Sequence, residues 1–180
     1  MKNSIVSEHK IKGFILAGFS GIGKTMLAQK YSNVVDLDPF VYAYSDNLNG
    51  ESIEKHKGET HIPNPDWPQN YLDEIKRCTK IYDLVLVWDR IDIVKEYIAN
   101  NFSFAICYPD DNSLKKFYKD RFLSRGNSEK YVEWKLKQYE EKIAFFDTLD
   151  VPKYILKENE TLEDFLKKNS FSLQTKSTLS

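Results

Sequence analysis

The sequence predicts an α/β protein in which helices cover both faces of a five-stranded parallel sheet, forming a three-layer sandwich. Two observations carry this prediction. Short apolar segments alternate with segments of helical periodicity, and the apolar segments are nearly continuous in hydrophobic residues. Continuous apolar strands are typical of a parallel sheet that is buried on both faces. Parallel strands also need crossover connections, which helices supply.

Five segments are expected to form strands: 11–17, 33–37, 81–88, 102–108 and 151–156. Helices are expected at 23–31, after Asp66, at 91–100, at 113–123, from Ser128 onward and at 161–168. Asp66 is a plausible cap with Pro68 in the first turn, and Thr161 with Asp164 resembles a capping box. Residues 38–65 are expected to be irregular or partly helical.

The helix from Ser128 has one apolar stripe, made by Val132, Leu136, Tyr139, Ile143 and Phe146. These residues recur at alternating steps of four and three, which places them on one face of a helix. The polar tail from Ser170 is expected to fray.

Composition bounds the possible partners and the compartment. The chain has 180 residues, enough for one domain, and 26 basic residues nearly balance 27 acidic ones. No overall field would therefore hold it on nucleic acid or on an anionic membrane. Cys78 and Cys107 lie in apolar surroundings, as expected of buried thiols in a reducing compartment. With no leader segment or membrane span in the sequence, we expect a cytoplasmic protein.

The most specific motif joins the first expected strand to the first expected helix. Residues 18–25, GFSGIGKT, match G-x-x-x-x-G-K-S/T at every fixed position in a strand-loop-helix context. In such a loop, backbone N–H groups cradle phosphates, Lys24 reaches the outer phosphates and the Thr25 hydroxyl binds Mg²⁺. The alternative is a glycine-rich turn with a solvated lysine. The residues expected to bind the nucleotide are Gly18, Ser20, Gly21, Ile22, Gly23, Lys24, Thr25 and Met26.

Acidic residues follow two of the expected strands. Asp36 and Asp38 lie at the end of the second strand, where i, i+2 spacing puts both side chains on one face. Asp36 is the better candidate for a catalytic or magnesium role, whereas Asp38 is a candidate substrate contact or a cap for the turn at Pro39. Asp89 follows the third strand and is expected either to position magnesium or to cap the next helix.

The chain has only four arginines, and two of them lie close together. Arg121 and Arg125 are at i, i+4 on an expected helix that stops at Gly126, which favours a lid that closes over phosphates. The alternative is a solvated helix end paired with Asp120 or Glu129. Arg77 is expected to be an ordinary surface residue.

Three features together resemble the P-loop kinases of small molecules, a group that includes nucleoside monophosphate, shikimate and gluconate kinases. They are the phosphate-binding loop, the Asp-x-Asp after the second strand and the Arg-x-x-x-Arg-Gly segment. The segments VVDLDPF and NPDWPQNY are also similar to those of small ATP-binding proteins of bacteria and phages. The chain departs from shikimate kinases at residues 87–90, VWDR, where their glycine-rich acceptor motif is missing. The acceptor-binding arginine set of adenylate kinases is also incomplete.

The resemblance implies the sheet order 2-3-1-4-5 and one kinase-like domain at 1–169. It implies an acceptor-side segment at about 40–66, a lid at about 110–147, and a tail at 170–180. The ligands would be ATP with Mg²⁺, and an acceptor near Asp36, Asp38 and Arg90. Lys24, Asp36, Arg121 and Arg125 would act in catalysis. Thr25, Asp36 and Asp89 are the candidate metal residues.

Three functions follow as hypotheses. The first is transfer of the terminal phosphoryl group of ATP to a nucleoside monophosphate or a similar phosphorylated molecule, which needs no strong base. The second is transfer to a hydroxyl of a small metabolite, with Asp36 accepting the proton. The third is a nucleotide-dependent switch or ATPase. The sequence identifies no protein partner.

Overall fold

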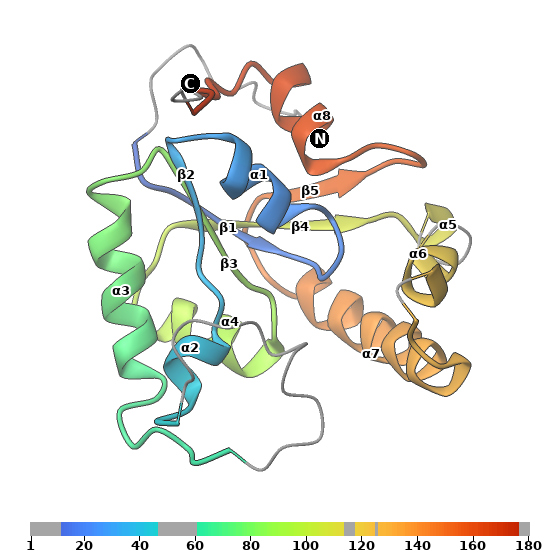
Figure 1. Ribbon diagram of the computed structural model, residues 1–180, viewed down its shortest axis with the longest axis horizontal. Coiled ribbons are helices and arrows are strands. Elements are labelled where there is room, and N and C mark those ends of the chain that lie inside the picture. Colours follow the sequence, from blue (N-terminus) through green and yellow to red (C-terminus); the bar gives the residue numbers. More distant parts are fainter. Residues whose placement is uncertain (1–11, 47–60, 114–117, 125, 177–180) are drawn as a thin grey trace.

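The computed structural model describes residues 12–46, 61–113, 118–124 and 126–176. Five parallel strands form one sheet in the order β2-β3-β1-β4-β5 (Figure 1). The predicted α/β class, the number of strands, their parallel direction and their order are therefore confirmed. The strands are β1 (Phe14–Gly18), β2 (Val34–Asp36), β3 (Leu84–Trp88), β4 (Phe104–Pro109) and β5 (Lys153–Leu156).

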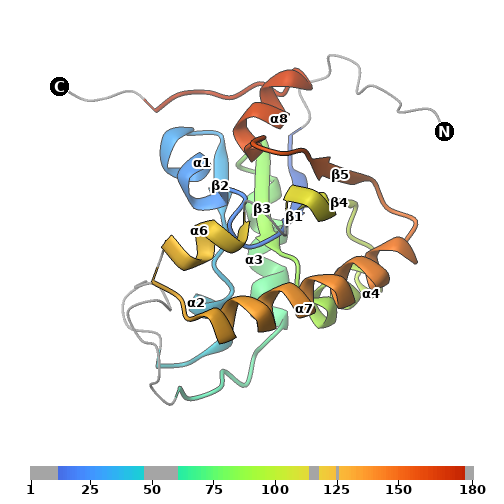
Figure 2. The same cartoon turned by 90° about the vertical axis from the view of Figure 1, so that its right-hand side faces the viewer.

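Helices lie on both sides of this sheet. Helices α1 and α8 lie on one side, and α3, α4 and α7 lie on the other (Figures 1 and 2). This arrangement confirms the predicted three layers. The helices are α1 (Lys24–Lys30), α2 (Phe40–Ala43), α3 (Gln69–Thr79), α4 (Ile91–Ala99), α5 (Asp111–Ser113), α6 (Lys119–Ser124), α7 (Glu129–Asp147) and α8 (Leu162–Lys168).

Helix starts agree with the sequence at two places and differ at a third. Ser128 caps α7 by accepting a hydrogen bond from the backbone of Tyr131, and Thr161 and Asp164 form the expected capping box on α8. The expected cap at Asp66 is wrong, because α3 begins after Pro68 and no side chain caps it. A turn closed by hydrogen bonds to Asn64 places Asp66 ahead of the helix.

The core lies between the sheet and its helices. The apolar stripe of α7 faces it, with Val132, Tyr139 and Phe146 buried and the other two stripe residues partly buried. Helix α7, which the sequence assigned to the lid, thus packs on the sheet. Cys78 and Cys107 are free and buried, as expected. Among the described residues, no helix combines the length and apolar character needed to cross a membrane.

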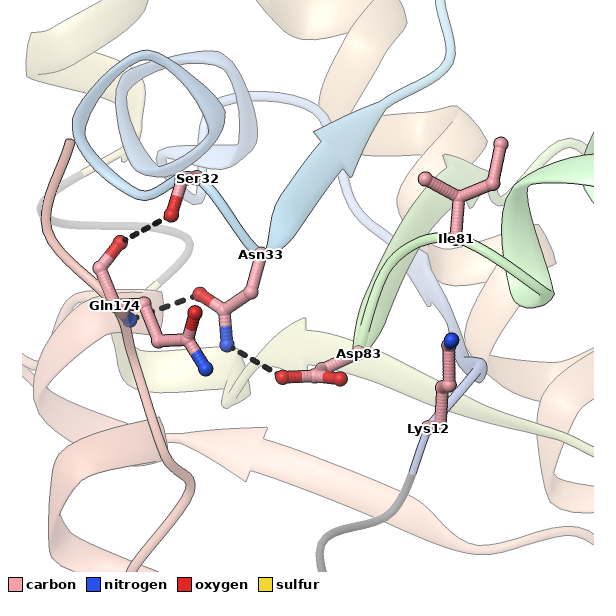
Figure 3. Close-up of a pocket in the computed structure, with 6 residues that line it drawn as sticks. All are labelled: Lys12, Ser32, Asn33, Ile81, Asp83 and Gln174. Carbon is pink, nitrogen blue, oxygen red and sulfur yellow. Dashed lines mark hydrogen bonds between the residues drawn. The ribbon is translucent and has the colours of Figure 1, made fainter.

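The expectation that the tail frays from Ser170 is wrong for residues 170–176. The side-chain amide of Asn33 donates to the Ser172 carbonyl at 2.7 Å. It also donates to Asp83 Oδ2 at 2.9 Å, and its Oδ1 accepts from the Gln174 backbone (Figure 3). Lys176 bonds through its backbone to the Lys30 carbonyl and through its ammonium to the Ala28 carbonyl. The segment therefore satisfies carbonyl groups at the end of α1 that the helix leaves unpaired.

Replacing Asn33 with alanine is expected to destabilise the protein, because the Gln174 N–H and the Ser172 carbonyl lose their buried partner. We expect a loss of about 1–3 kcal/mol in the free energy of unfolding, measured by urea denaturation. Ser32→Ala is the matched control, since its hydroxyl makes one exposed bond to the same segment. Equal stability of the two variants would show that the Asn33 bonds do not hold the tail.

Candidate phosphate-binding site

The candidate site is the loop between β1 and α1, at the carboxyl end of the central strand. Gly18 ends β1 and is paired in register with Trp88 on one side and Cys107 on the other. Helix α1 begins at Lys24 after Gly23, which has φ 102° and so adopts a left-handed conformation that favours glycine. The strand-loop-helix arrangement predicted for the motif is present.

Lys24 folds back across the loop. Its ammonium donates to the Gly18 carbonyl at 2.7 Å and to the Phe19 carbonyl at 3.2 Å. A Cβ atom at Gly18 would lie only 2.8 Å from Lys24 Cδ, so glycine leaves the space in which the lysine stem lies. The positive charge of the Lys24 ammonium therefore lies against the backbone of the loop.

A hydrogen bond joins the loop to β2. The Thr25 hydroxyl donates to Asp36 Oδ2 at 2.8 Å, so the end of the motif and the first acid of the Asp-x-Asp pair are in contact. Both groups offer oxygen atoms, the ligand type that Mg²⁺ prefers, and magnesium is commonly held by one or two carboxylates together with substrate phosphates. The pair fits such an ion. No cluster of three or more His, Cys, Asp or Glu side chains suited to a metal occurs among the described residues.

Burial raises the pKa of Asp36 above its ordinary value, and Asp38 adds to this, while Lys24 and the Thr25 hydroxyl oppose it. The folded state therefore favours the protonated form of Asp36. Asp36 thus contributes its full stability at pH values below its pKa in the unfolded chain. That contribution is lost as the pH rises through its higher pKa in the folded protein. At neutral pH, Lys24 and the Thr25 hydroxyl offset only part of the cost of burying this carboxylate, and a bound cation would offset more of it.

The two residues expected to contact the acceptor have partners of their own. Asp38 Oδ1 accepts a hydrogen bond from the Phe40 backbone at 3.0 Å, which confirms the interpretation of Asp38 as a cap. Arg90 directs Nε and Nη2 to the carboxylate of Asp92, and its guanidinium lies 4.4 Å from the centre of the Trp88 ring. Trp88 is the register partner of Gly18, so this stack borders the loop.

Asp89 is fully buried and forms an ion pair with Lys142 of α7 at 2.7 Å. Its other oxygen, Oδ2, has no hydrogen-bond partner in the described structure. The helix-cap interpretation of Asp89 is wrong, because Arg90 is the N-cap of α4 and the Asp89 side chain bonds to Lys142 instead. Lys142 also lies 5.3 Å from the centre of the Phe19 ring, so the pair borders the loop.

One lid arginine reaches the loop. Arg121 Nη1 donates to the Gly21 carbonyl at 2.5 Å, and its guanidinium lies 5.3 Å from the centre of the Tyr118 ring. Arg125 lies outside the described residues. Gly126 has φ 78° and follows α6, as expected of a helix that stops at a glycine. Arg77 pairs with Glu74 on the surface of α3, in agreement with its ordinary role.

The remaining loop residues differ in exposure. Ser20 and Gly21 are half-buried, Ile22 is buried and accepts a hydrogen bond from Leu162 through its carbonyl, and Met26 is 74 % exposed. The side chain of Met26 thus makes little contact with the fold.

The residues that pack against the core side of the loop were not predicted from the sequence. Phe19 is buried, with its ring edge-on to Tyr139 at 5.0 Å and to Tyr118 at 6.0 Å. Lys142 was also missed, although it lies three residues after Tyr139 and therefore beside it on α7. The position of Lys142 beside the apolar stripe of α7 was the feature of the sequence that could have indicated its contact with the loop.

Comparison with protein-family models finds no match to this chain, and comparison with curated proteins finds none that is significantly similar.

Replacing Thr25 with alanine is expected to raise the magnesium concentration needed for nucleotide binding, because one of the paired oxygen ligands is lost. Asp36→Asn should share this defect and yet be more stable than wild type at pH 7, since it removes a half-buried charge. Calorimetric nucleotide titrations at several magnesium concentrations, together with thermal denaturation at pH 4 and 7, measure both effects. An unchanged magnesium requirement in both variants would exclude the assigned ligands.

Proposed function

We propose that the protein is a P-loop phosphotransferase that binds ATP with Mg²⁺ at residues 18–25 and transfers the terminal phosphoryl group to a phosphorylated small molecule. The observation that carries the proposal is the contact between Thr25 and Asp36 at 2.8 Å beside the Lys24 ammonium. A cation and an oxygen ligand at the end of a glycine-containing loop, together with a second oxygen ligand from the end of β2, suit a triphosphate and its metal ion.

Each residue has a distinct task in this reaction. Lys24 would exchange its carbonyl partners for phosphate oxygens and neutralise their charge. Thr25 and Asp36 would hold the metal ion, which neutralises charge on the phosphates when bound. Arg121, already in contact with Gly21, would approach the phosphoryl group during transfer.

The partners of Asp36 and Asp38 favour a phosphorylated acceptor over a hydroxyl. A hydroxyl acceptor benefits from a carboxylate that accepts its proton. Asp36 Oδ2 accepts a hydrogen bond from the Thr25 hydroxyl, and Asp38 Oδ1 accepts one from the Phe40 backbone. One oxygen of each carboxylate therefore already has a partner. A phosphate acceptor is already anionic and requires no such base.

A coupled assay of ADP release tests the proposal directly. The protein is incubated with ATP and Mg²⁺ in three arms: with nucleoside monophosphates, with hydroxylated metabolites, and without acceptor. We expect turnover that depends on a phosphorylated acceptor. Turnover only with a hydroxylated metabolite would assign the second hypothesis, and turnover that needs no acceptor would assign an ATPase or switch.

Arg121→Lys is expected to lower turnover with little change in ATP affinity. Lysine keeps the charge but loses the planar fork that matches phosphate oxygens in two places. If the contact matters mainly in the transition state, kcat falls while ATP binding measured without acceptor persists. Equal losses in binding and turnover would instead place Arg121 in the ground-state nucleotide site.

A further inference from the structure

Two aromatic side chains from the segment of α6 cover Gly21, the fourth residue of the phosphate-binding loop (Figure 2). Gly21 has φ 90°, and a Cβ atom at this position would lie 3.4 Å from Tyr118 Cε1 and 3.6 Å from Phe122 Cε1. Both rings therefore lie within van der Waals reach of the loop, on the side where another residue would carry its side chain.

The two rings form one buried contact with the loop. Tyr118 directly precedes α6, Phe122 lies four positions later, and their ring centres are 6.2 Å apart. Both side chains are buried. Tyr118 also meets the ring of Phe19 edge-on, with the ring centres 6.0 Å apart. The segment of α6 thus packs against two residues of the loop, and burial of aromatic surface holds it there.

Phe19 is itself fixed to the sheet and to α7. Its backbone N–H donates to the Cys107 carbonyl of β4 at 2.9 Å, and its ring is edge-on to Tyr139 of α7 at 5.0 Å. The Tyr139 hydroxyl in turn donates to the carbonyl of Pro109, the last residue of β4. The aromatic contact therefore joins α6 to a part of the loop that the rest of the fold holds in place.

Arg121 lies between the two rings in sequence and contacts the same loop residue. Its Nη1 atom donates to the Gly21 carbonyl at 2.5 Å, and its guanidinium lies 5.3 Å from the centre of the Tyr118 ring. Because the rings fix the backbone of α6, the guanidinium can exchange this carbonyl for a phosphate oxygen by rotation of its own side chain.

We propose that Phe122 and Tyr118 are positioning residues for Arg121, which hold α6 against Gly21 and so align the guanidinium with the transferring phosphoryl group. This inference rests on the proposed function, because it assumes that phosphoryl transfer takes place at the loop. In this role the rings contact the loop and not the ligand, so their effect on the reaction passes through Arg121. A misplacement of about 1 Å can lower turnover by about a hundredfold.

Phe122→Leu tests the proposal by kinetics. Leucine keeps most of the buried volume, so the fold is retained, but it loses the ring that contacts Gly21. We expect kcat to fall by at least about tenfold in the arm of the ADP-release assay that wild type supports. ATP affinity, measured by calorimetry without acceptor, should stay within about twofold of wild type. Tyr118→Leu should behave in the same way, and it replaces Phe122→Leu if that variant does not fold.

Phe104→Leu is the matched control. Phe104 is 5 % exposed and Phe122 is 4 % exposed, but Phe104 begins β4 and pairs in register with Ile15, at the opposite end of the sheet from the loop. Urea denaturation of both variants measures their stability, and Phe104→Leu should keep the kcat of wild type. If Phe104→Leu lowers kcat as much as Phe122→Leu, a general loss of packing explains both results and the proposal is overturned.

A double-variant cycle shows whether the ring acts through the guanidinium. In the Arg121→Ala background, Phe122→Leu should lower kcat by less than about twofold, because no guanidinium remains to be positioned. The same loss of kcat in both backgrounds would show that Phe122 acts independently of Arg121 and would overturn the proposal. Equal losses of ATP affinity and kcat in Phe122→Leu would also overturn it, because the ring would then support nucleotide binding by the loop.

The same assays distinguish failure of this proposal from failure of the proposed function. If wild type turns over ATP, Lys24→Ala does not, and Phe122→Leu and Tyr118→Leu keep the kcat of wild type, only the positioning role is wrong. If wild type releases no ADP in any arm of the assay, the proposed function is wrong and this proposal is wrong with it.

Discussion

Lys24→Ala is expected to lower turnover by far more than about tenfold, which corresponds to about 1.4 kcal/mol in activation free energy. The Lys24 ammonium donates to two carbonyl groups of the loop and is the charge best placed to neutralise the transferring phosphoryl group. Arg121 and Lys142 reach the loop from other elements and keep their own contacts with Gly21 and Asp89, so they should not replace it.

Lys24→Met and Lys30→Ala are the controls for this prediction. Methionine keeps the stem that packs beside Gly18 but removes the charge, so it should be as inactive as alanine. Lys30 lies at the end of the same helix and pairs with Glu163, a residue that is distant from the motif in sequence. Its loss should leave turnover close to wild type. A Lys24→Ala variant that retains more than a tenth of wild-type turnover would refute the role assigned to Lys24.

Lys142→Met is expected to destabilise the fold by about 3–5 kcal/mol, because it leaves the buried carboxylate of Asp89 without its cation. Asp89 has 0 % relative exposure, and the Lys142 side chain is only 11 % exposed. The free energy of unfolding from urea denaturation at pH 7 measures the loss. Lys137→Met, on the exposed side of the same helix, should be nearly neutral.

A double variant isolates the cause of that loss. Asp89→Asn combined with Lys142→Met removes both charges, and it should recover much of the stability that Lys142→Met alone loses. A double variant as unstable as the single one would mean that packing of the Lys142 stem, rather than the uncompensated charge, holds α7 in place.

The sequence predicted the sheet well because its three central strands, β1, β3 and β4, are continuous apolar segments. Leu84–Trp88, for example, lies wholly within the predicted segment 81–88. The Lys24 loop was predictable because the motif specifies residue types at fixed spacing. These features depend on local pattern, which a single sequence displays directly.

The rest of the candidate site depends on contacts between distant segments. Asp89 pairs with a lysine 53 positions later, and the position of Asp89 after β3 gave no indication of that partner. Residues 170–176 were misjudged for the same reason, since their hydrogen-bond partners, such as Asn33 and Lys30, are distant in sequence.

The bonds between Asn33 and residues 172 and 174 also bear on how the chain folds during synthesis. Asn33 is part of the connection between α1 and β2, and its partners lie 139 and 141 positions later. Contacts of such long sequence separation form late, because the intervening chain must first be closed into a loop. The ribosome must therefore complete almost the whole chain before the end of α1 acquires its last hydrogen bonds. Until then, the helix that begins at Lys24 is held by its own turns, by the packing of Leu27 and by contacts with nearby segments, such as the bond between Thr25 and Asp36.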